Sequence, residues 1–222
     1  MKKTVFILVL LLAFSSMAFA SPLSDYSKGN TSFDINWRPD FNGMDKYTSS
    51  WSESDSYSTM KLNGNRRTYD WTVTTGLGNN FALQYSQYRP VGQSEYGSEW
   101  GMSTKELNVL YQLNKKVSAF AGYHRAHYVG EPYTPNSNRL QVGLIGYDKI
   151  ADKTTLYGTL GVGNDLLNWE TGVSYQVAPN LEVNLSYRYK KVSNLSDGYE
   201  TENDYTDNVT ARGFGYGITY KF

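Results

Sequence analysis

Apolar and polar residues alternate one by one along most of this chain, and this period of two limits its fold more than any other feature. In residues 167–177, for example, Leu167, Trp169 and Val173 alternate with polar residues or glycine at the even positions. Successive side chains of a β-strand point to opposite faces of a sheet, so this spacing gives each strand one apolar and one polar face. The alternation predicts an all-β protein.

Ten segments of the chain carry the alternation. Their apolar positions lie in residues 33–37, 69–73, 81–85, 107–113, 117–123, 140–144, 156–162, 167–177, 181–189 and 214–222. The expected strands are mostly about ten residues long, which is the length that a tilted membrane strand needs. Two of the segments, near 140–147 and 154–163, are weaker, and eight strands is the alternative if they are not strands.

The connections between these segments also alternate in length. Short polar turns lie near 78–80, 114–116, 148–153 and 178–180, whereas long polar loops lie at roughly 39–67, 90–104, 129–138 and 191–208. The link at 164–166 is short and departs from this rule. Short turns at one end and long loops at the other are typical of an outer-membrane barrel, with the long loops facing the exterior.

The first twenty residues have the features of a secretory signal peptide. Lys2 and Lys3 precede an apolar run from Val5 to Phe14, and the small-residue site Ala18-Phe19-Ala20 follows. The apolar run is shorter than the roughly 20 residues that a membrane-spanning helix needs. We therefore expect residues 1–20 to be removed and residues 21–222 to form one domain.

The end of the chain carries the most specific resemblance. The run from Gly213 to Phe222 alternates Phe214, Tyr216, Ile218 and Tyr220 with small or polar residues and ends in an aromatic residue. With the signal peptide and the strand pattern, it resembles the small bacterial outer-membrane β-barrels of the OmpA/OmpX-like or porin-like kind.

This resemblance implies an antiparallel up-and-down transmembrane β-barrel in the bacterial outer membrane. It also implies that Phe222 and Tyr220 are read by the barrel assembly machinery, and that outer-membrane lipids and lipopolysaccharide surround a monomer. A soluble or secreted β-protein is the alternative, because its strands would alternate as well. Aromatic residues at the ends of the apolar stripes favour lipid; they are Trp37, Tyr69, Trp71, Tyr111, Trp169, Tyr175 and Tyr187.

The polar face of each strand would line the lumen of the barrel. It carries acids and bases in nearly equal number, and a barrel of this size is filled or nearly filled by its side chains. Because unpaired buried charges are costly, we expect these residues to pair and to close the lumen. The predicted charge network comprises Asp34, Arg38, Asp70, Glu106, Arg139, Glu170, Glu182 and Arg188. A narrow pore for ions or small solutes is the alternative.

The composition argues against catalysis and nucleic-acid binding. Lys and Arg total 21 and Asp and Glu total 21, so no positive charge is left over for a phosphate backbone. The chain has no Cys and only His124 and His127. We predict no catalytic residue, metal ligand or cofactor. An enzyme at the outer rim that acts on lipid or lipopolysaccharide would need these histidines and is a lesser alternative, and weak Ca²⁺ binding by acids of the 191–208 loop or adhesion by aromatics of the 39–67 loop is weaker still.

Overall fold

The computed structural model describes residues 22–38, 42–49, 58–63, 68–93, 99–130, 136–196 and 205–222. Within these ranges the ordered elements are all strands, in agreement with the period of two. The signal peptide predicted for residues 1–20 lies outside the described residues and remains a prediction.

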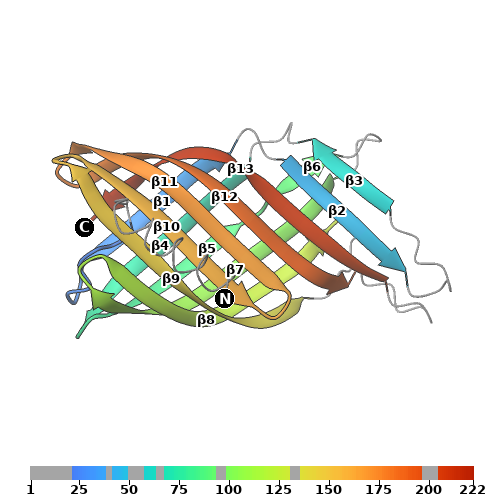
Figure 1. Cartoon of the computed structure of the whole chain (residues 1–222), viewed down its shortest axis with the longest axis horizontal. Coiled ribbons are helices and arrows are strands. Elements are labelled where there is room, and N and C mark those ends of the chain that lie inside the picture. Colours follow the sequence, from blue (N-terminus) through green and yellow to red (C-terminus); the bar gives the residue numbers. More distant parts are fainter. Residues whose placement is uncertain are drawn as a thin grey trace, which may run out of the picture.

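Ten antiparallel strands close into a barrel (Figure 1). In order around the wall they are β1 (Thr31–Arg38), β4 (Thr68–Gly78), β5 (Phe81–Tyr88), β7 (Glu99–Asn114), β8 (Val117–Val129), β9 (Ser137–Ala151), β10 (Thr154–Gly163), β11 (Leu166–Ala178), β12 (Leu181–Ser196) and β13 (Tyr205–Lys221). Pairing of β1 with β13 closes the ring. Each predicted segment corresponds to one of these strands, so ten is confirmed and eight is wrong.

One end of the barrel, which we call the turn end, carries the short connections between β4 and β5, β7 and β8, β9 and β10, and β11 and β12. Both residues of the first of these turns, Asn79 and Asn80, have positive φ (51° and 66°), as a tight hairpin turn requires. The end of the chain lies here too, where the Phe222 N–H donates to the Thr31 carbonyl at 2.8 Å. We call the opposite end the loop end.

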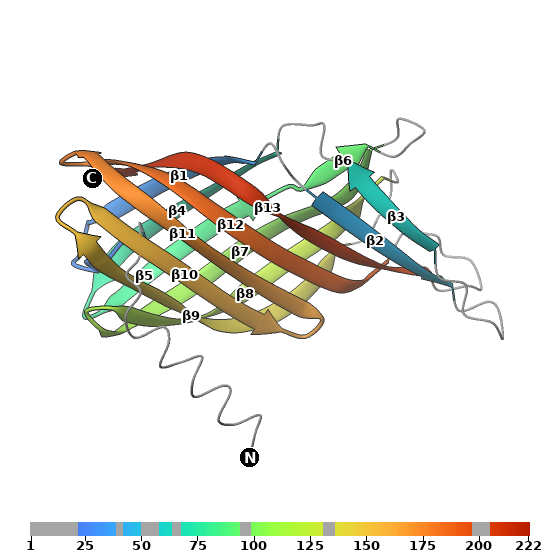
Figure 2. The same ribbon diagram turned by 45° about the horizontal axis from the view of Figure 1, so that its top comes forward.

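The loop end is more ordered than the sequence predicts. The long loops expected at 39–67 and 90–104 contain three further strands, namely β2 (Asn42–Ser49), β3 (Ser58–Asn63) and β6 (Val91–Gln93). They join β13 to β7 through the order β13-β2-β3-β6-β7 and extend the wall past the barrel on one side (Figure 2). The loop expected at 191–208 is also shorter, because β12 continues to Ser196 and β13 begins at Tyr205. Strands of 16 and 17 residues exceed the roughly 9–11 that cross a membrane, so their ends project beyond it.

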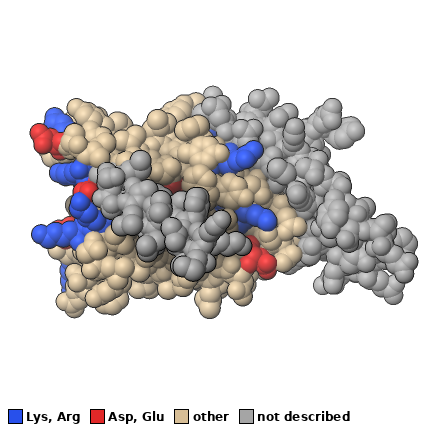
Figure 3. Space-filling view, viewed as in Figure 1, with Lys and Arg blue, Asp and Glu red and all other residues tan. Residues whose placement is uncertain are grey.

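The two faces of the barrel wall have opposite polarity. Along β13 the outward side chains Phe214, Tyr216 and Ile218 are 46–55% exposed, whereas the inward Thr219 is fully buried. Other strands repeat this, with apolar residues outside and polar residues inside. Soluble monomers rarely expose so large a continuous apolar surface, whereas a transmembrane barrel places this surface in lipid. On the side of the barrel that Figure 3 shows, the visible part of the wall is mostly uncharged, and most of the visible Lys, Arg, Asp and Glu lie toward its two ends.

Candidate functional site

Four predicted lumen residues form one ion-pair cluster. Arg38 on β1 pairs with Asp70 on β4 and, at 2.8 Å, with Glu170 on β11. Arg188 on β12 lies 3.2 Å from Asp70, and its Nε donates to Glu170 at 2.7 Å. All four side chains are at most 16% exposed. The cluster ties together one side of the wall, from β4 through β1, β13 and β12 to β11.

Glycines on β13 make the reach of Arg38 possible. Gly215 lies beneath the Arg38 side chain, and a Cβ at this position would come within 2.7 Å of the Arg38 Cγ. The guanidinium thus passes over β13 to Glu170, two strands beyond it. The ring of Tyr88 completes the cluster, with its centroid 5.0 Å from the Arg188 Cζ and 6.0 Å from the Arg38 Cζ, within the range of cation–π attraction.

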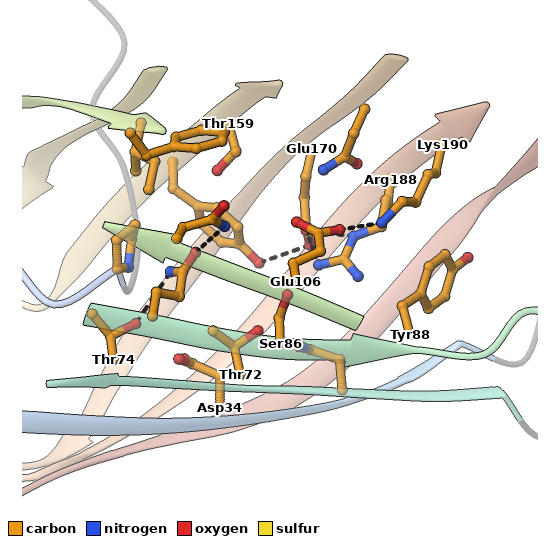
Figure 4. Close-up of a pocket in the computed structure, with 18 of the residues that line it drawn as sticks. Asp34, Thr72, Thr74, Ser86, Tyr88, Glu106, Thr159, Glu170, Arg188 and Lys190 are labelled. Atoms are coloured by element: carbon orange, nitrogen blue, oxygen red, sulfur yellow. Dashed lines mark hydrogen bonds and ion pairs between the residues drawn. The ribbon is translucent and has the colours of Figure 1, made fainter. Parts of the chain in front are cut away.

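A second cluster crosses the lumen. The Lys190 ammonium on β12 pairs with the Glu106 carboxylate on β7, and these two strands lie five places apart around the ten-strand ring in either direction. This ion pair therefore spans the full width of the barrel, as Figure 4 shows. Gln141 donates to Glu106 at 2.8 Å, and the fully buried His124 has its Nε2 3.9 Å from the same carboxylate.

The remaining predicted charges are elsewhere. Toward the turn end, Glu182 pairs with Lys221 and accepts a hydrogen bond from Ser174 at 2.8 Å, while Asp34 accepts one from Thr219. Arg139 joins none of these clusters of described residues.

The Arg139 guanidinium instead donates to the backbone carbonyls of Ser193 at 2.6 Å, Asn194 at 3.2 Å and Asp165 at 3.4 Å. It fastens a bulge of β12 to the β10–β11 turn near the loop end. The single network predicted for the lumen is therefore several separate clusters, and Arg139 has a different role.

Two apolar layers inside the lumen were missed by sequence reasoning. The loop-end layer consists of Tyr88, Met102, Ala126, Tyr128, Leu166, Val192, Leu195, Val209 and Ala211. The turn-end layer consists of Leu23, Tyr26, Ala82, Leu110, Phe120, Ile145 and Tyr147. A signal was present, because Leu110 and Phe120 stand at positions where the alternation requires an inward side chain, yet they are apolar. Along β7, Glu106 of the second cluster lies between Met102 of the loop-end layer and Leu110 of the turn-end layer.

Residues 22–30, which we call the N-terminal plug, fold into the turn end of the lumen. Leu23 and Tyr26 are at most 4% exposed, and the Tyr26 hydroxyl donates to Ser118 Oγ at 3.0 Å. Gly78 N–H donates to the Tyr26 carbonyl at 2.9 Å. On the exposed side, hydrogen bonds from Ser27 lower the pKa of the Asp25 carboxyl, so this turn of the plug stays ionised at neutral pH. The plug thus occupies part of the lumen at this end.

A cavity of about 100 Å³ remains in the middle of the lumen. Its lining includes Asp34, Asn36, Glu106, Glu170, Arg188 and Lys190, several of which are labelled in Figure 4. Small-molecule sites in proteins usually measure roughly 300–1,000 Å³, so this cavity is too small for a nutrient-sized solute. A hollow of about 480 Å³ lies at the turn end among Lys115, Lys116, Lys149 and Lys153, beside the plug.

The predicted lipid-interface aromatics all stand on the outward face of their strands. Tyr111, Tyr175 and Tyr69 are 42–50% exposed. The others pack on outward neighbours, with ring centroids 4.9 Å apart for Trp37 and Tyr216, 5.3 Å for Trp71 and Tyr85, and 5.5 Å for Trp169 and Tyr187. Tyr220 and Phe222 also point outward, with ring centroids 4.8 Å apart.

No protein-family model and no curated protein matches the chain. Solved structures do match it. The outer membrane protease OmpT from Escherichia coli superposes with a TM-score of 0.62 at 13% identity, covering 87% of this chain and 97% of that one. The fold is that of the small bacterial outer-membrane β-barrels. Neisserial surface protein A also matches, with a TM-score of 0.39 at 18% identity, covering 88% of this chain and 100% of that one.

Proposed function

We propose that this protein is an integral barrel of the bacterial outer membrane that neither conducts solutes nor catalyses a reaction, and that it acts through its outward-facing surfaces. The observation that carries the proposal is the Glu106–Lys190 ion pair across the full width of the lumen, with an apolar layer on each side of it.

The barriers lie in series along the barrel axis. An ion entering at the loop end meets the loop-end layer, in which Met102, Val192 and Val209 are fully buried. Beyond it the cations Arg38, Arg188 and Lys190 are already paired with carboxylates, and the N-terminal plug follows. Because a permeating ion would have to break buried ion pairs and leave water at two apolar levels, the barrier to conduction is high.

The apolar outer surface and the predicted signal peptide both support a location in the outer membrane. The outward apolar band needs lipid, and residues 1–20 have the features of an export signal. Outward Phe222 ends the last strand, as expected for recognition by the barrel assembly machinery. In this setting a monomer surrounded by outer-membrane lipids and lipopolysaccharide is the simplest state, because the ring of strands has no open edge.

The resemblance to OmpT, which is described as a protease, concerns the fold alone. A rim enzyme on this chain would depend on its two histidines. His124 is fully buried beside Glu106, and His127 stands on the outward face of β8. This separation supports a protein without catalytic activity.

Planar-bilayer conductance of refolded residues 21–222 tests the proposal. Heat-modifiable gel migration first confirms that the barrel is closed. We expect no discrete conductance steps from the wild type, while a general porin gives steps in the same bilayers. A variant weakens all three barriers, with two serines each in the plug, the lumen ion pair and the loop-end layer (Leu23→Ser, Tyr26→Ser, Glu106→Ser, Lys190→Ser, Met102→Ser and Val192→Ser). Once heat-modifiable migration shows that it folds, it should give steps. Reproducible steps from the wild type would overturn the closed lumen.

A further inference from the structure

Cations end several of the outward apolar stripes on the loop-end side. On β7 the exposed Leu107 is followed outward by Lys105, and on β8 Tyr123 is followed by Arg125. The same order recurs on β12 and β13, where Lys191 and Arg212 are exposed. These residues point away from the lumen, so the ion pairs inside the barrel do not involve them.

Lys105 and Arg125 face each other directly across the β7–β8 pair. Like charges in directly opposite positions destabilise a sheet, because their Cβ atoms are only about 4.5–5.5 Å apart. Among the residues that the structure describes, no carboxylate pairs with either of them. Arg125 donates from Nε to Asn136 Oδ1 at 2.8 Å, which orients the guanidinium, and no other described residue accepts from its two terminal nitrogens.

Two further basic residues border this pair. His127 stands two positions beyond Arg125 on the same face of β8, within electrostatic range of Arg89, Lys105 and Arg125. Arg89, at the end of β5, already has a counter-ion, since its Nη2 lies 3.6 Å from Glu99 Oε2. Within the described part of the chain, the full positive charges of Lys105 and Arg125 are therefore left without a carboxylate partner at the edge of the lipid-facing band.

We propose that Lys105 and Arg125 form a binding site for the phosphomonoester group of an anionic lipid in the outer leaflet. This inference rests on the proposed function, because the outer-membrane orientation places the loop end in that leaflet. A phosphomonoester carries about −1.5 to −2 charges at pH 7 and so matches two cations, whereas the single charge of a phosphodiester leaves one unmatched. The guanidinium can bind two phosphate oxygens side by side, and the ammonium adds a point charge.

The position of the pair suits a lipid better than a free anion. Leu107 and Tyr123, the next outward residues toward the membrane, are 46% and 44% exposed and continue into the apolar band. A lipid bound there can pack its acyl chains on this band while its phosphate contacts the two cations. Lys191 and Arg212 are offset along their strands, with Lys191 opposite Thr210 and Arg212 opposite Tyr189. They therefore repel each other less than Lys105 and Arg125 do, and they have less need of a bound anion.

The test uses refolded residues 21–222 in phosphatidylcholine vesicles to which diphosphorylated lipid A is added. Native mass spectrometry measures lipid retention, and the midpoint of heat-modifiable migration measures stability. We expect Lys105→Gln with Arg125→Gln to weaken lipid A binding at least tenfold, or about 1.4 kcal/mol, because both charged contacts with the phosphate are lost. The matched control, Lys149→Gln with Lys153→Gln, removes two exposed cations at the turn end and should bind as the wild type does.

Three outcomes would overturn the site. The first is equal lipid A binding by the Lys105/Arg125 variant and the wild type, or an equal loss in the turn-end control. The second is that the wild type retains phosphatidylglycerol, which carries only a phosphodiester, as well as it retains lipid A. The third is that inorganic phosphate alone raises the midpoint of heat-modifiable migration as much as lipid A does. Exchanging the cations, Lys105→Arg with Arg125→Lys, should preserve binding. A closed, silent barrel without lipid A binding refutes only this inference, whereas a conducting wild type refutes the closed lumen.

Discussion

The lumen and the outer wall of this barrel are built from alternate residues of the same strands, yet they obey opposite rules. Inside, single contacts matter, because Glu106, Lys190, Arg38 and Asp70 are buried and each has a specific partner. Outside, Val109 and its neighbours contact lipid, which any apolar side chain of similar size can do. One residue along a strand therefore separates a position that tolerates little change from one that tolerates much.

Removing half of the pair that spans the lumen should have the largest effect. Glu106→Ala leaves the Lys190 ammonium buried, and among the described residues the Thr104 hydroxyl, at 3.2 Å, is then its one remaining acceptor. Breaking a buried ion pair in this way costs about 3–5 kcal/mol. Urea unfolding in lipid vesicles measures the loss, and Val109→Ala on the outer face of the same strand is the control. A loss no larger than that of the control would mean that the lumen ion pair does not brace the barrel.

A charge introduced on the lipid-facing side of the wall should lower the free energy of unfolding, although the lumen side of the same strands carries paired charges. Val109→Arg places a guanidinium within the lipid-facing stripe of Leu107, Val109, Tyr111 and Leu113. Arg near the bilayer midplane costs a transmembrane barrel about 2–4 kcal/mol. The same unfolding assay measures it, with Lys105→Arg at the edge of the stripe as a neutral control. If Val109→Arg is also neutral, this face does not lie in hydrocarbon.

Filling the space beneath Arg38 should lower stability more than changing the outward residue next to it on β13. Gly215→Val inserts a side chain where a Cβ alone would already lie 2.7 Å from the Arg38 Cγ. Overpacking of this kind costs about 1–3 kcal/mol, and displacement of Arg38 would also weaken its pairs with Asp70 and Glu170. Tyr216→Phe, one residue further along β13, is the control on the lipid side. Equal stability of both variants would show that Arg38 can reach Asp70 and Glu170 without the space above Gly215.

How much of this could be predicted from the sequence differs between the two faces. The period of two is local information, and it was enough to find ten strands and to decide which side chains point inward. Partners inside the lumen are not local. Glu106 meets Lys190 84 positions away and five strands around the ring, and this depends on the register of every strand between them. The apolar layers had a local signal, in the inward parity of Leu110 and Phe120. Strand β2 had none, since its residues do not alternate, and β3 had only a short one, in which Met60 and Leu62 alternate with polar residues.

The smallest effect should come from the aromatic residues of the outer wall. Trp169 stacks on Tyr189 with an interplanar angle of 10° and ring centroids 5.8 Å apart, and it also contacts Tyr187. Such a ring contact contributes about 0.5–1.5 kcal/mol beyond its buried area, so Trp169→Leu should lower the free energy of unfolding by about that much. Tyr187→Leu in the Trp169→Leu background should then cost less than Tyr187→Leu alone, because the shared contact is already gone. If the two losses simply add, the rings are independent, and the outer wall is as replaceable at its aromatic positions as it is at Val109.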